Sequence, residues 1–407
     1  MTFDIQKVRS DFPILKTLVY GKPLVYLDNA ATTQKPQVVI DAIAQYYTTY
    51  NSNIHRASHY LANLATEAHE TARKTVQQYI NAEHLFEVIF TRGTTEAINL
   101  VAFAFGQAFI NPGDEVIVTE LEHHSNFVPW QMMCERRGAR FLVVPFDKNG
   151  ELRLDVYENL LSEKTRIVAF NHVSNSLGTI NPAKKIIDMA HDAGAVVMVD
   201  AAQSVQHIEH DVQALDADFY AFSGHKMYGP TGIGVLYGKE KWLNAMPPYQ
   251  GGGEMIDIVT IDKTTYNKLP FKFEAGTPNI VGPIGLAAAI EYLNMLSFGN
   301  IRAHEDDVFE YAQSRLLEIK DLTLYGNAKN RTSVLPFNIE GIHHYDLGTL
   351  LDTYGIAVRT GHHCTQPIMT ALGIEGTVRA SLALYNTKSE IDSLISAIEK
   401  IKKMLGK

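Results

Sequence analysis

The sequence predicts an α/β protein whose core is a mainly parallel β-sheet. Between about residues 85 and 240, seven short β-branched runs alternate with segments of helix length. Strands separated in this way are joined by crossover connections, which make neighbouring strands parallel and cover both faces of the sheet. The 407 residues exceed what one compact core usually holds. We therefore expect a second, smaller domain.

The seven runs are predicted to be buried strands because each is short and rich in apolar residues. In chain order they are Glu87–Thr91, Glu115–Thr119, Arg140–Pro145, Arg166–Phe170, Ala195–Asp200, Asp218–Phe222 and Gly234–Tyr237. A turn-rich segment at Glu274–Asn279 then precedes a long helix that ends near Leu296, and we expect a domain boundary near this turn. Beyond it, we expect a strand at Arg331–Ile339 and an amphipathic helix at Ser389–Leu405.

The composition argues against nucleic-acid and membrane proteins. Hydrophobic residues make up 46% of the chain, and 36 basic against 45 acidic residues give a net charge of −9. No apolar run approaches membrane-spanning length, and charged residues stand where a secretory signal needs an apolar stretch. Two cysteines are too few for a disulfide framework. We expect a cytoplasmic protein that binds neither nucleic acid nor membrane.

Polar residues gather at the predicted strand ends, where ligands bind in sheets of this kind. They are Thr91, Thr119, His172, Asp200 and Ser223–Lys226. The pairing of Asp200 with Lys226 suits pyridoxal phosphate (PLP), because the amine can form a Schiff base and the carboxylate can keep the pyridine nitrogen protonated. For these two residues alone, a surface lysine beside a strand-end aspartate is an equal alternative.

A candidate phosphate site follows the first strand. The segment Thr91–Glu96 offers a glycine turn, the hydroxyls of Thr94 and Thr95, and free backbone amides at a helix start. A threonine that only caps the helix is the alternative. Further donors from Ser223 and His225 make the phosphate interpretation the better one.

Two other polar side chains also come just after strands. His123 could stack on a flat cofactor and move protons. A metal at His123 and His124 is disfavoured, because no third ligand has suitable spacing. Asn175 could contact cofactor or substrate through its amide, with an ordinary asparagine turn as the alternative.

The C-terminal part contains a candidate nucleophile. Cys364 lies in a loop bounded by Gly, His and Pro, so we expect it to be exposed, with neighbouring His and Arg side chains favouring its thiolate. Cys134 lies in a helical context and is expected to be buried and inert. Arg379 offers a planar fork that suits an amino-acid carboxylate.

Together these strings resemble the cysteine desulfurases of the fold-type I PLP enzymes, in particular the SufS-like branch, which is related to selenocysteine lyases. The similarity spans Tyr26–Thr33, Ser223–Lys226, Arg359–Cys364 and Arg379–Asn386. It implies a large domain over residues 21–275 with a mainly parallel seven-stranded sheet. It also implies a smaller α+β domain over residues 276–407 that carries the cysteine loop, with residues 1–20 packed on it.

The resemblance also implies a role for each candidate residue. Lys226 would hold PLP, Asp200 would pair with the pyridine nitrogen, and Gln203 would reach the ring hydroxyl. The residues implied at the phosphate are Thr94, Thr95, Ser223, His225 and, from a second subunit, Thr277. His123 would stack on the ring and take part in catalysis. The residues implied at the substrate are Arg359, Arg379, Asn175, His55 and Arg56.

The activity that the resemblance implies is conversion of L-cysteine to L-alanine by a homodimer. Cys364 would take the sulfur as a persulfide and pass it to a SufE-like or SufU-like protein for iron–sulfur cluster assembly. Selenocysteine lyase activity is also implied, and selenocysteine or cysteine sulfinate remain alternative preferred substrates. A PLP aminotransferase, or a lyase without a persulfide, would need Lys226 and Asp200 but no reactive thiol. A PLP-fold regulator would need a DNA-reading module, for which the chain has no basic domain.

Overall fold

The largest sheet in the computed structural model, which describes residues 3–56 and 58–407, runs through the middle of the chain. Its seven strands have the order β4-β10-β9-β8-β7-β5-β6. Their bounds are β4 (Val88–Thr91), β5 (Glu115–Thr119), β6 (Arg140–Val144), β7 (Thr165–Asn171), β8 (Val196–Asp200), β9 (Phe219–Ser223) and β10 (Gly234–Gly238). Only β10 runs antiparallel to its neighbours in this sheet. The predicted mainly parallel sheet is confirmed.

Both faces of this sheet are buried, as a parallel sheet requires. Successive side chains of a strand point to opposite faces, so Val197 and Val199 of β8 join one apolar cluster while Val196 and Met198 join another. The second cluster is covered by α4 (Thr94–Phe109) and α5 (Val128–Arg137). Helices that cover the first cluster include α3 (Tyr60–Tyr79), α7 (Ala183–Asp192) and α10 (Val281–Leu296).

A second sheet of four strands forms near the C-terminus, in the order β13-β14-β17-β16. Its strands are β13 (Leu322–Leu324), β14 (Val334–Ile339), β16 (Arg359–Gly361) and β17 (Thr377–Ser381). The helices around it are α11 (Phe298–Leu317), α12 (His344–Asp352), α13 (Gln366–Leu372) and α14 (Lys388–Met404). The strand predicted in this region is present but begins three residues later, and the predicted closing helix is present with both ends one residue earlier.

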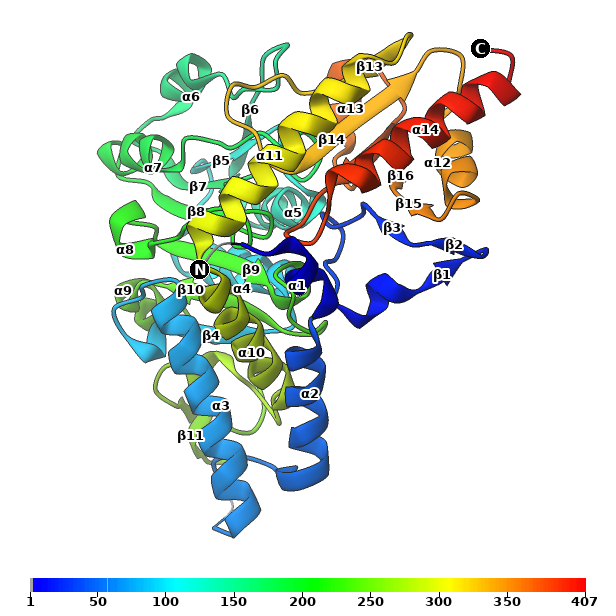
Figure 1. Ribbon diagram of the computed structural model, residues 1–407. Coiled ribbons are helices and arrows are strands. Elements are labelled where there is room, and N and C mark those ends of the chain that lie inside the picture. Colours follow the sequence, from blue (N-terminus) through cyan, green and yellow to red (C-terminus); the bar gives the residue numbers. More distant parts are fainter. Residues whose placement is uncertain (1–2, 57) are drawn as a thin grey trace.

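The N-terminal segment packs against C-terminal elements, and α1 (Ile5–Ser10) lies beside the start of α14 (Figure 1). The short strand β3 (Val25–Tyr26) pairs in parallel with β15 (Ile356–Ala357). Upstream, Arg9 of α1 forms an ion pair with Glu390, with 3.0 Å between Nη1 and Oε1. These contacts carry residues 25–28 to the second sheet, where they reach the site described below.

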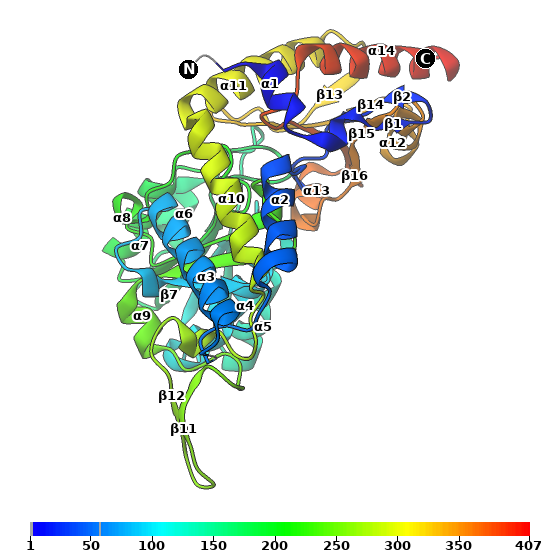
Figure 2. The same ribbon diagram turned by 60° about the horizontal axis from the view of Figure 1, so that its bottom comes forward.

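The remaining elements connect the two sheets or lie at the surface. They are β1 (Leu18–Val19), β2 (Lys22–Pro23), α2 (Gln37–Gln45), α6 (Leu154–Leu160), α8 (Val212–Leu215), α9 (Glu240–Ala245), β11 (Ile256–Val259) and β12 (Thr264–Tyr266). The hairpin β11–β12 projects away from the body (Figure 2). Among the described residues, no single helix is long and apolar enough to cross a membrane. The pair α10 and α11 meets that test only when joined, across a bend of 80°.

The division into residues 1–20, 21–275 and 276–407 remains a prediction. Helix α10 follows the predicted boundary, yet its side chains Leu286 and Ile290 belong to the apolar cluster on the large sheet. Helix α11 contacts both clusters: Ile301 near its start belongs to the cluster on the large sheet, and Val308 and Leu316 belong to the cluster of the second sheet. This packing favours a boundary within α11, because a domain is defined by its own core.

Candidate active site

A cavity of about 250 Å³ lies between the carboxyl ends of the large sheet and the second sheet. It collects most of the side chains predicted for the site: Thr94, Thr95, His123, Asn175, Asp200, Gln203, Ser223, His225, Lys226, Arg359, Cys364 and Arg379. A larger cavity of about 520 Å³ between α4 and α5 contains none of these residues. Chemistry, rather than size, therefore identifies the smaller cavity as the candidate active site.

Lys226 and Asp200 occupy neighbouring strand ends in this cavity. Asp200 ends β8, and Lys226 lies in the 3₁₀ turn Gly224–Lys226 directly after β9. Burial lowers the pKa of Lys226 to about 8, although the charge of Asp200 acts in the opposite direction. Burial also raises the pKa of Asp200, whose Oδ1 accepts a hydrogen bond of 2.9 Å from the amide of Ala202. The site thus holds an amine that is easily made neutral and a carboxylate that a buried cation would stabilise.

The start of α4 forms the other end of the cavity. The amide of Thr94 donates to Oγ of Ser223 at 2.9 Å, and the two hydroxyl oxygens are 2.8 Å apart. These contacts join the first turn of α4 to the end of β9. Free amides at the start of a 16-residue helix, with hydroxyls beside them, suit an anionic group such as a phosphate.

Gly234 allows this corner to close. A Cβ atom at Gly234 would lie 2.4 Å from the Cα of Gly93, closer than real side chains approach a backbone. We expect Gly234→Ala to lower the free energy of unfolding by about 1–3 kcal/mol and to weaken anion binding, measured by urea unfolding and PLP titration. In the control Gly299→Ala, the new Cβ would meet nothing within 4 Å. If the two variants had the same free energy of unfolding, the backbone at Gly234 would move away from Gly93 without cost, and the prediction would be wrong.

His123 is held as a neutral ring. The amide of Ser125 donates to Nδ1 of His123 at 3.1 Å, so Nδ1 is an acceptor and the ring proton resides on Nε2. Burial, and next the charge of Lys226, lowers the pKa of His123 to about 3. The ring is therefore an uncharged N–H donor at neutral pH, suited to contact with a flat cofactor.

Cys364 lies in a tight loop with an unusual backbone. Both His363 (φ 52°) and Cys364 (φ 58°) adopt the left-handed conformation, which is rare for residues other than glycine. Hydrogen bonds hold the loop: the amide of His124 donates to the carbonyl of Cys364 at 2.8 Å, and Asn175 Nδ2 donates to the carbonyl of His363 at 2.8 Å. The exposed thiol also lines the cavity. Cys134 is buried, as predicted.

Three predicted residues do not line this cavity. Thr277 lies in a separate cavity with Glu96 and Asn279. His55 and Arg56 both contact the carboxylate of Glu254. Arg56 Nε lies 2.8 Å from Oε2 of Glu254, and His55 Nδ1 lies 3.4 Å from Oε1. Their roles at the cofactor phosphate and the substrate entrance remain predictions. For Thr277, the prediction requires a second subunit.

Sequence reasoning gave no role at the site to two residues that contact it, Asp28 and His124. Asp28 forms ion pairs with both Arg359 and Arg379. His124 binds the cysteine loop at two points, because its Nε2 also accepts from the amide of Gln366 at 3.2 Å. Asp28 was part of the Tyr26–Thr33 string, yet nothing near it in the sequence indicates that it meets two arginines more than 300 residues away.

Comparison with known proteins places the chain in a family. Residues 25–394 match the model of the aminotransferase class-V family. The chain belongs to this family. A cysteine desulfurase of Synechococcus elongatus is 53% identical over 399 residues, which are 98% of this chain and 64% of that protein. A cysteine desulfurase of Escherichia coli is 51% identical over 407 residues, the whole of both chains.

Solved structures agree with this class-V assignment. The cysteine desulfurase CsdA of Escherichia coli, solved as its S-sulfonic acid, superposes with a TM-score of 0.92 at 41% identity, covering 99% of this chain and all of CsdA. The apo cysteine desulfurase of Thermococcus onnurineus superposes with a TM-score of 0.93 at 39% identity, covering 98% of both chains. The predicted resemblance to cysteine desulfurases is therefore confirmed.

The residues of the cavity fit the cofactor of a class-V enzyme. Among the described residues, Nζ of Lys226 makes no hydrogen bond, so it is free to bind an aldehyde. Asp200 suits a protonated pyridine nitrogen, and the corner of Thr94 and Ser223 suits a phosphate. Gln203 also lines the cavity, although its Nε2 donates to the carbonyl of Ala30 at 2.6 Å. The family and this donor set together indicate PLP as the cofactor.

The lowered pKa of Lys226 predicts how PLP uptake depends on pH. Only the neutral amine attacks an aldehyde, and the pKa of Lys226 is about 8 rather than the usual 10.5. The rate of PLP uptake by the apoprotein should therefore rise about tenfold per pH unit below this pKa and level off above it. Stopped-flow absorbance would measure the rate. A rate that keeps rising to about pH 10 would contradict the lowered pKa.

Proposed function

We propose that this protein is a PLP-dependent cysteine desulfurase that converts L-cysteine to L-alanine and keeps the sulfur as a persulfide on Cys364. The observation that carries the proposal is that Cys364 and Lys226 line one cavity, although they follow strands of different sheets, β16 and β9. A class-V aminotransferase site would need Lys226 but no thiol. The names of the Synechococcus elongatus and Escherichia coli relatives support the same activity.

In the proposed reaction, Lys226 and Cys364 carry out different steps. When bound, PLP supplies an electron sink that makes the substrate Cα–H bond easier to break. Lys226, as a neutral amine, takes the Cα proton. The Cys364 thiolate attacks the substrate sulfur, so that an S–S bond forms as the Cβ–S bond breaks and its electron pair stays with the carbon fragment. Protonation of that fragment gives alanine.

Product analysis tests the proposal. Purified protein with PLP, L-cysteine and a thiol reductant should release alanine and sulfide in equal amounts. Without reductant, mass spectrometry should find one additional sulfur atom on the peptide that carries Cys364 rather than on the peptide that carries Cys134. Pyruvate or a keto acid in place of alanine would instead favour a lyase or an aminotransferase, and no turnover of L-cysteine would contradict the proposal.

We further propose that the enzyme is a cytoplasmic homodimer of the SufS-like branch that supplies sulfur to iron–sulfur cluster assembly through a SufE-like or SufU-like acceptor. The string Arg359–Cys364, which is typical of that branch, supports this assignment. The structural similarity to CsdA of Escherichia coli supports the competing assignment, a CsdA-like enzyme. Stimulation of turnover by one purified acceptor and not by the others would decide between them.

Selenocysteine lyase activity is a second proposed reaction. The Cβ–Se bond is weaker than the Cβ–S bond, so its cleavage needs less help from Cys364. Alanine formation from L-selenocysteine should therefore persist in a Cys364→Ala variant that no longer acts on L-cysteine. If both reactions are lost to the same extent, selenium release also requires the thiol.

A further inference from the structure

The peptide group that joins His225 to Lys226 is held by residues from a distant part of the chain. Four donors from the segment between β3 and α2 lie within hydrogen-bond distance of one acceptor, the carbonyl oxygen of His225. They are the amide of Thr33 at 3.1 Å, Oγ1 of Thr33 at 3.2 Å, Oγ1 of Thr32 at 3.0 Å and Nζ of Lys35 at 3.0 Å. A carbonyl oxygen has only two lone pairs. The position of this peptide group is therefore fixed by more contacts than one hydrogen bond requires.

The same segment also holds the backbone that follows Lys226. Tyr228 is buried and adopts the left-handed conformation (φ 67°), which is unfavourable for a bulky side chain. Its amide donates to Oγ1 of Thr33 at 2.8 Å. A strained backbone persists only where its surroundings fix it. Thr33 thus contacts the chain one residue before and two residues after Lys226.

Lys35 is a partly buried cation that contacts backbone carbonyls. Its Nζ donates to the carbonyls of Thr33 and His225, and burial lowers its pKa to about 8. No carboxylate forms an ion pair with it in the part of the chain that the structure describes. An ammonium group is unfavourable to bury unless its donors find partners. The hydration that Lys35 loses is replaced by contacts that join Thr33 to the residue before Lys226.

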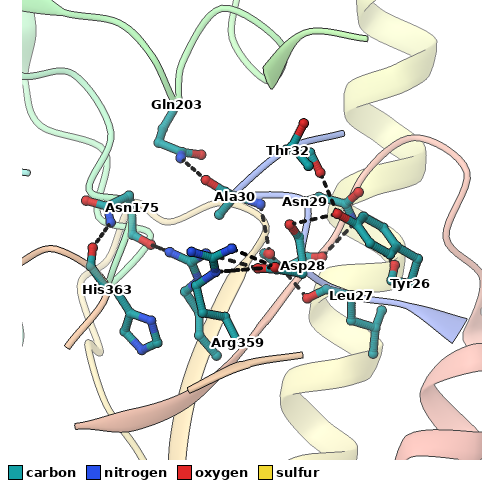
Figure 3. A network of polar contacts seen from close by, with 12 residues as sticks. Tyr26, Leu27, Asp28, Asn29, Ala30, Thr32, Asn175, Gln203, Arg359 and His363 are labelled. Atoms are coloured by element: carbon teal, nitrogen blue, oxygen red, sulfur yellow. Dashed lines mark hydrogen bonds and ion pairs between the residues drawn. The ribbon is translucent and has the colours of Figure 1, made fainter. Parts of the chain in front are cut away.

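The segment that supplies these donors is itself anchored (Figure 3). Oη of Tyr26 donates to the carbonyl of Thr32 at 2.9 Å, and Nε2 of Gln203 donates to the carbonyl of Ala30 at 2.6 Å. The amide of Ala30 donates to Oγ of Ser381, on β17, at 2.9 Å. These contacts leave the segment little freedom, so it can support the turn after β9.

Such support matters because Lys226 has to place one atom at a cofactor. Its side chain is a flexible four-carbon stem, and its Nζ makes no hydrogen bond among the described residues. The backbone is therefore the part of Lys226 that the protein holds in place. A misplacement of about 1 Å at a reacting group can lower a rate about 100-fold.

We propose that Thr33 and Lys35 are positioning residues for Lys226: they clamp the backbone on either side of it and so place its amine for reaction with the aldehyde of PLP. Their effect on turnover rests on the proposed function. Uptake of PLP by the apoprotein, measured without L-cysteine, does not.

The variant Lys35→Met removes the donor and keeps a long side chain. The rate of PLP uptake, followed by stopped-flow absorbance, should fall about tenfold or more. Lys35→Arg keeps a cationic donor and should recover most of the rate. In turnover, the loss should appear in kcat rather than in KM for L-cysteine, because no predicted substrate contact changes. An uptake rate within about twofold of the wild type would overturn the role of Lys35.

The matched control is Lys272→Met. Nζ of Lys272 also donates to two backbone carbonyls, those of Leu243 and Asn244, each at 3.0 Å, and burial lowers its pKa. Neither of these residues lines the cavity. PLP uptake should therefore stay at the wild-type rate. If Lys272→Met slows uptake as much as Lys35→Met does, the effect is a general loss of stability and the clamp is wrong.

The second member of the clamp is tested by Thr33→Val. This change keeps the branched shape and removes the hydroxyl that contacts both His225 and Tyr228. PLP uptake should slow about tenfold, and Thr33→Ser, which restores the hydroxyl, should recover it. Urea unfolding of each apoprotein verifies that it is folded under the conditions of uptake. A Thr33→Val protein that is less stable but takes up PLP at the wild-type rate would show that Thr33 only supports the fold.

Failure of the clamp and failure of the proposed function give different results. If the wild type takes up PLP but forms no alanine from L-cysteine, the proposed function is wrong, and the uptake rates still test Thr33 and Lys35. If the wild type forms alanine and the variants take up PLP at the wild-type rate, only the clamp is wrong.

Discussion

Replacement of Lys226 by alanine should abolish alanine formation from L-cysteine, with a decrease in kcat of at least about 1,000-fold. The side chain is predicted both to bind PLP covalently and to accept the Cα proton, and its lowered pKa makes the neutral amine available near neutral pH. No other lysine lines the cavity among the described residues. Alanine quantified after reaction with excess PLP measures the effect.

The control for this variant is Lys184→Ala. Lys184 lies on α7 in an exposed i,i+4 ion pair with Asp188, which contributes little to stability. It should retain wild-type turnover and the visible absorbance of bound PLP. A Lys226 variant that keeps more than about a tenth of the wild-type rate would exclude Lys226 as the catalytic base.

Replacement of Cys364 by alanine should lower alanine formation from L-cysteine about 100-fold or more, because the substrate sulfur then has no nucleophile to receive it. The visible absorbance of bound PLP should persist, since Lys226 and Asp200 remain in place. Serine should not rescue the activity, because an alkoxide is far less available than a thiolate at neutral pH. The measurement is the rate of alanine formation with L-cysteine and a reductant.

The matched control is Cys134→Ala, which removes the other cysteine of the chain. Cys134 is buried on α5, and burial raises its pKa to about 11, so its thiol is predominantly protonated at neutral pH. This variant should form alanine at close to the wild-type rate and still carry the additional sulfur atom. Full activity in Cys364→Ala would instead indicate direct elimination of sulfide without a persulfide.

Local patterns in the sequence were enough to predict much of the large sheet. Apolar runs with turn residues on either side predicted all seven strands to within one or two residues, and the long helix after Asn279 is present as α10. Lys226 and Asp200 stood out because Asp200 closes one such run and Lys226 lies in the turn after the next. These features depend on residues that are close together in the chain, so they can be predicted from the sequence alone.

Long-range packing decided the rest. The antiparallel pairing of β10 with β4 depends on contacts between strands more than a hundred residues apart in the chain. The sequence could not predict the pairing of β3 with β15, which brings Asp28 beside Arg359 and Arg379. These three residues share no local sequence pattern. They meet because burial of the two apolar cores fixes the position of each segment. The sequence by itself therefore determined which reactive side chains this protein carries, and the tertiary structure, through burial of the two cores, decided which of them lie together.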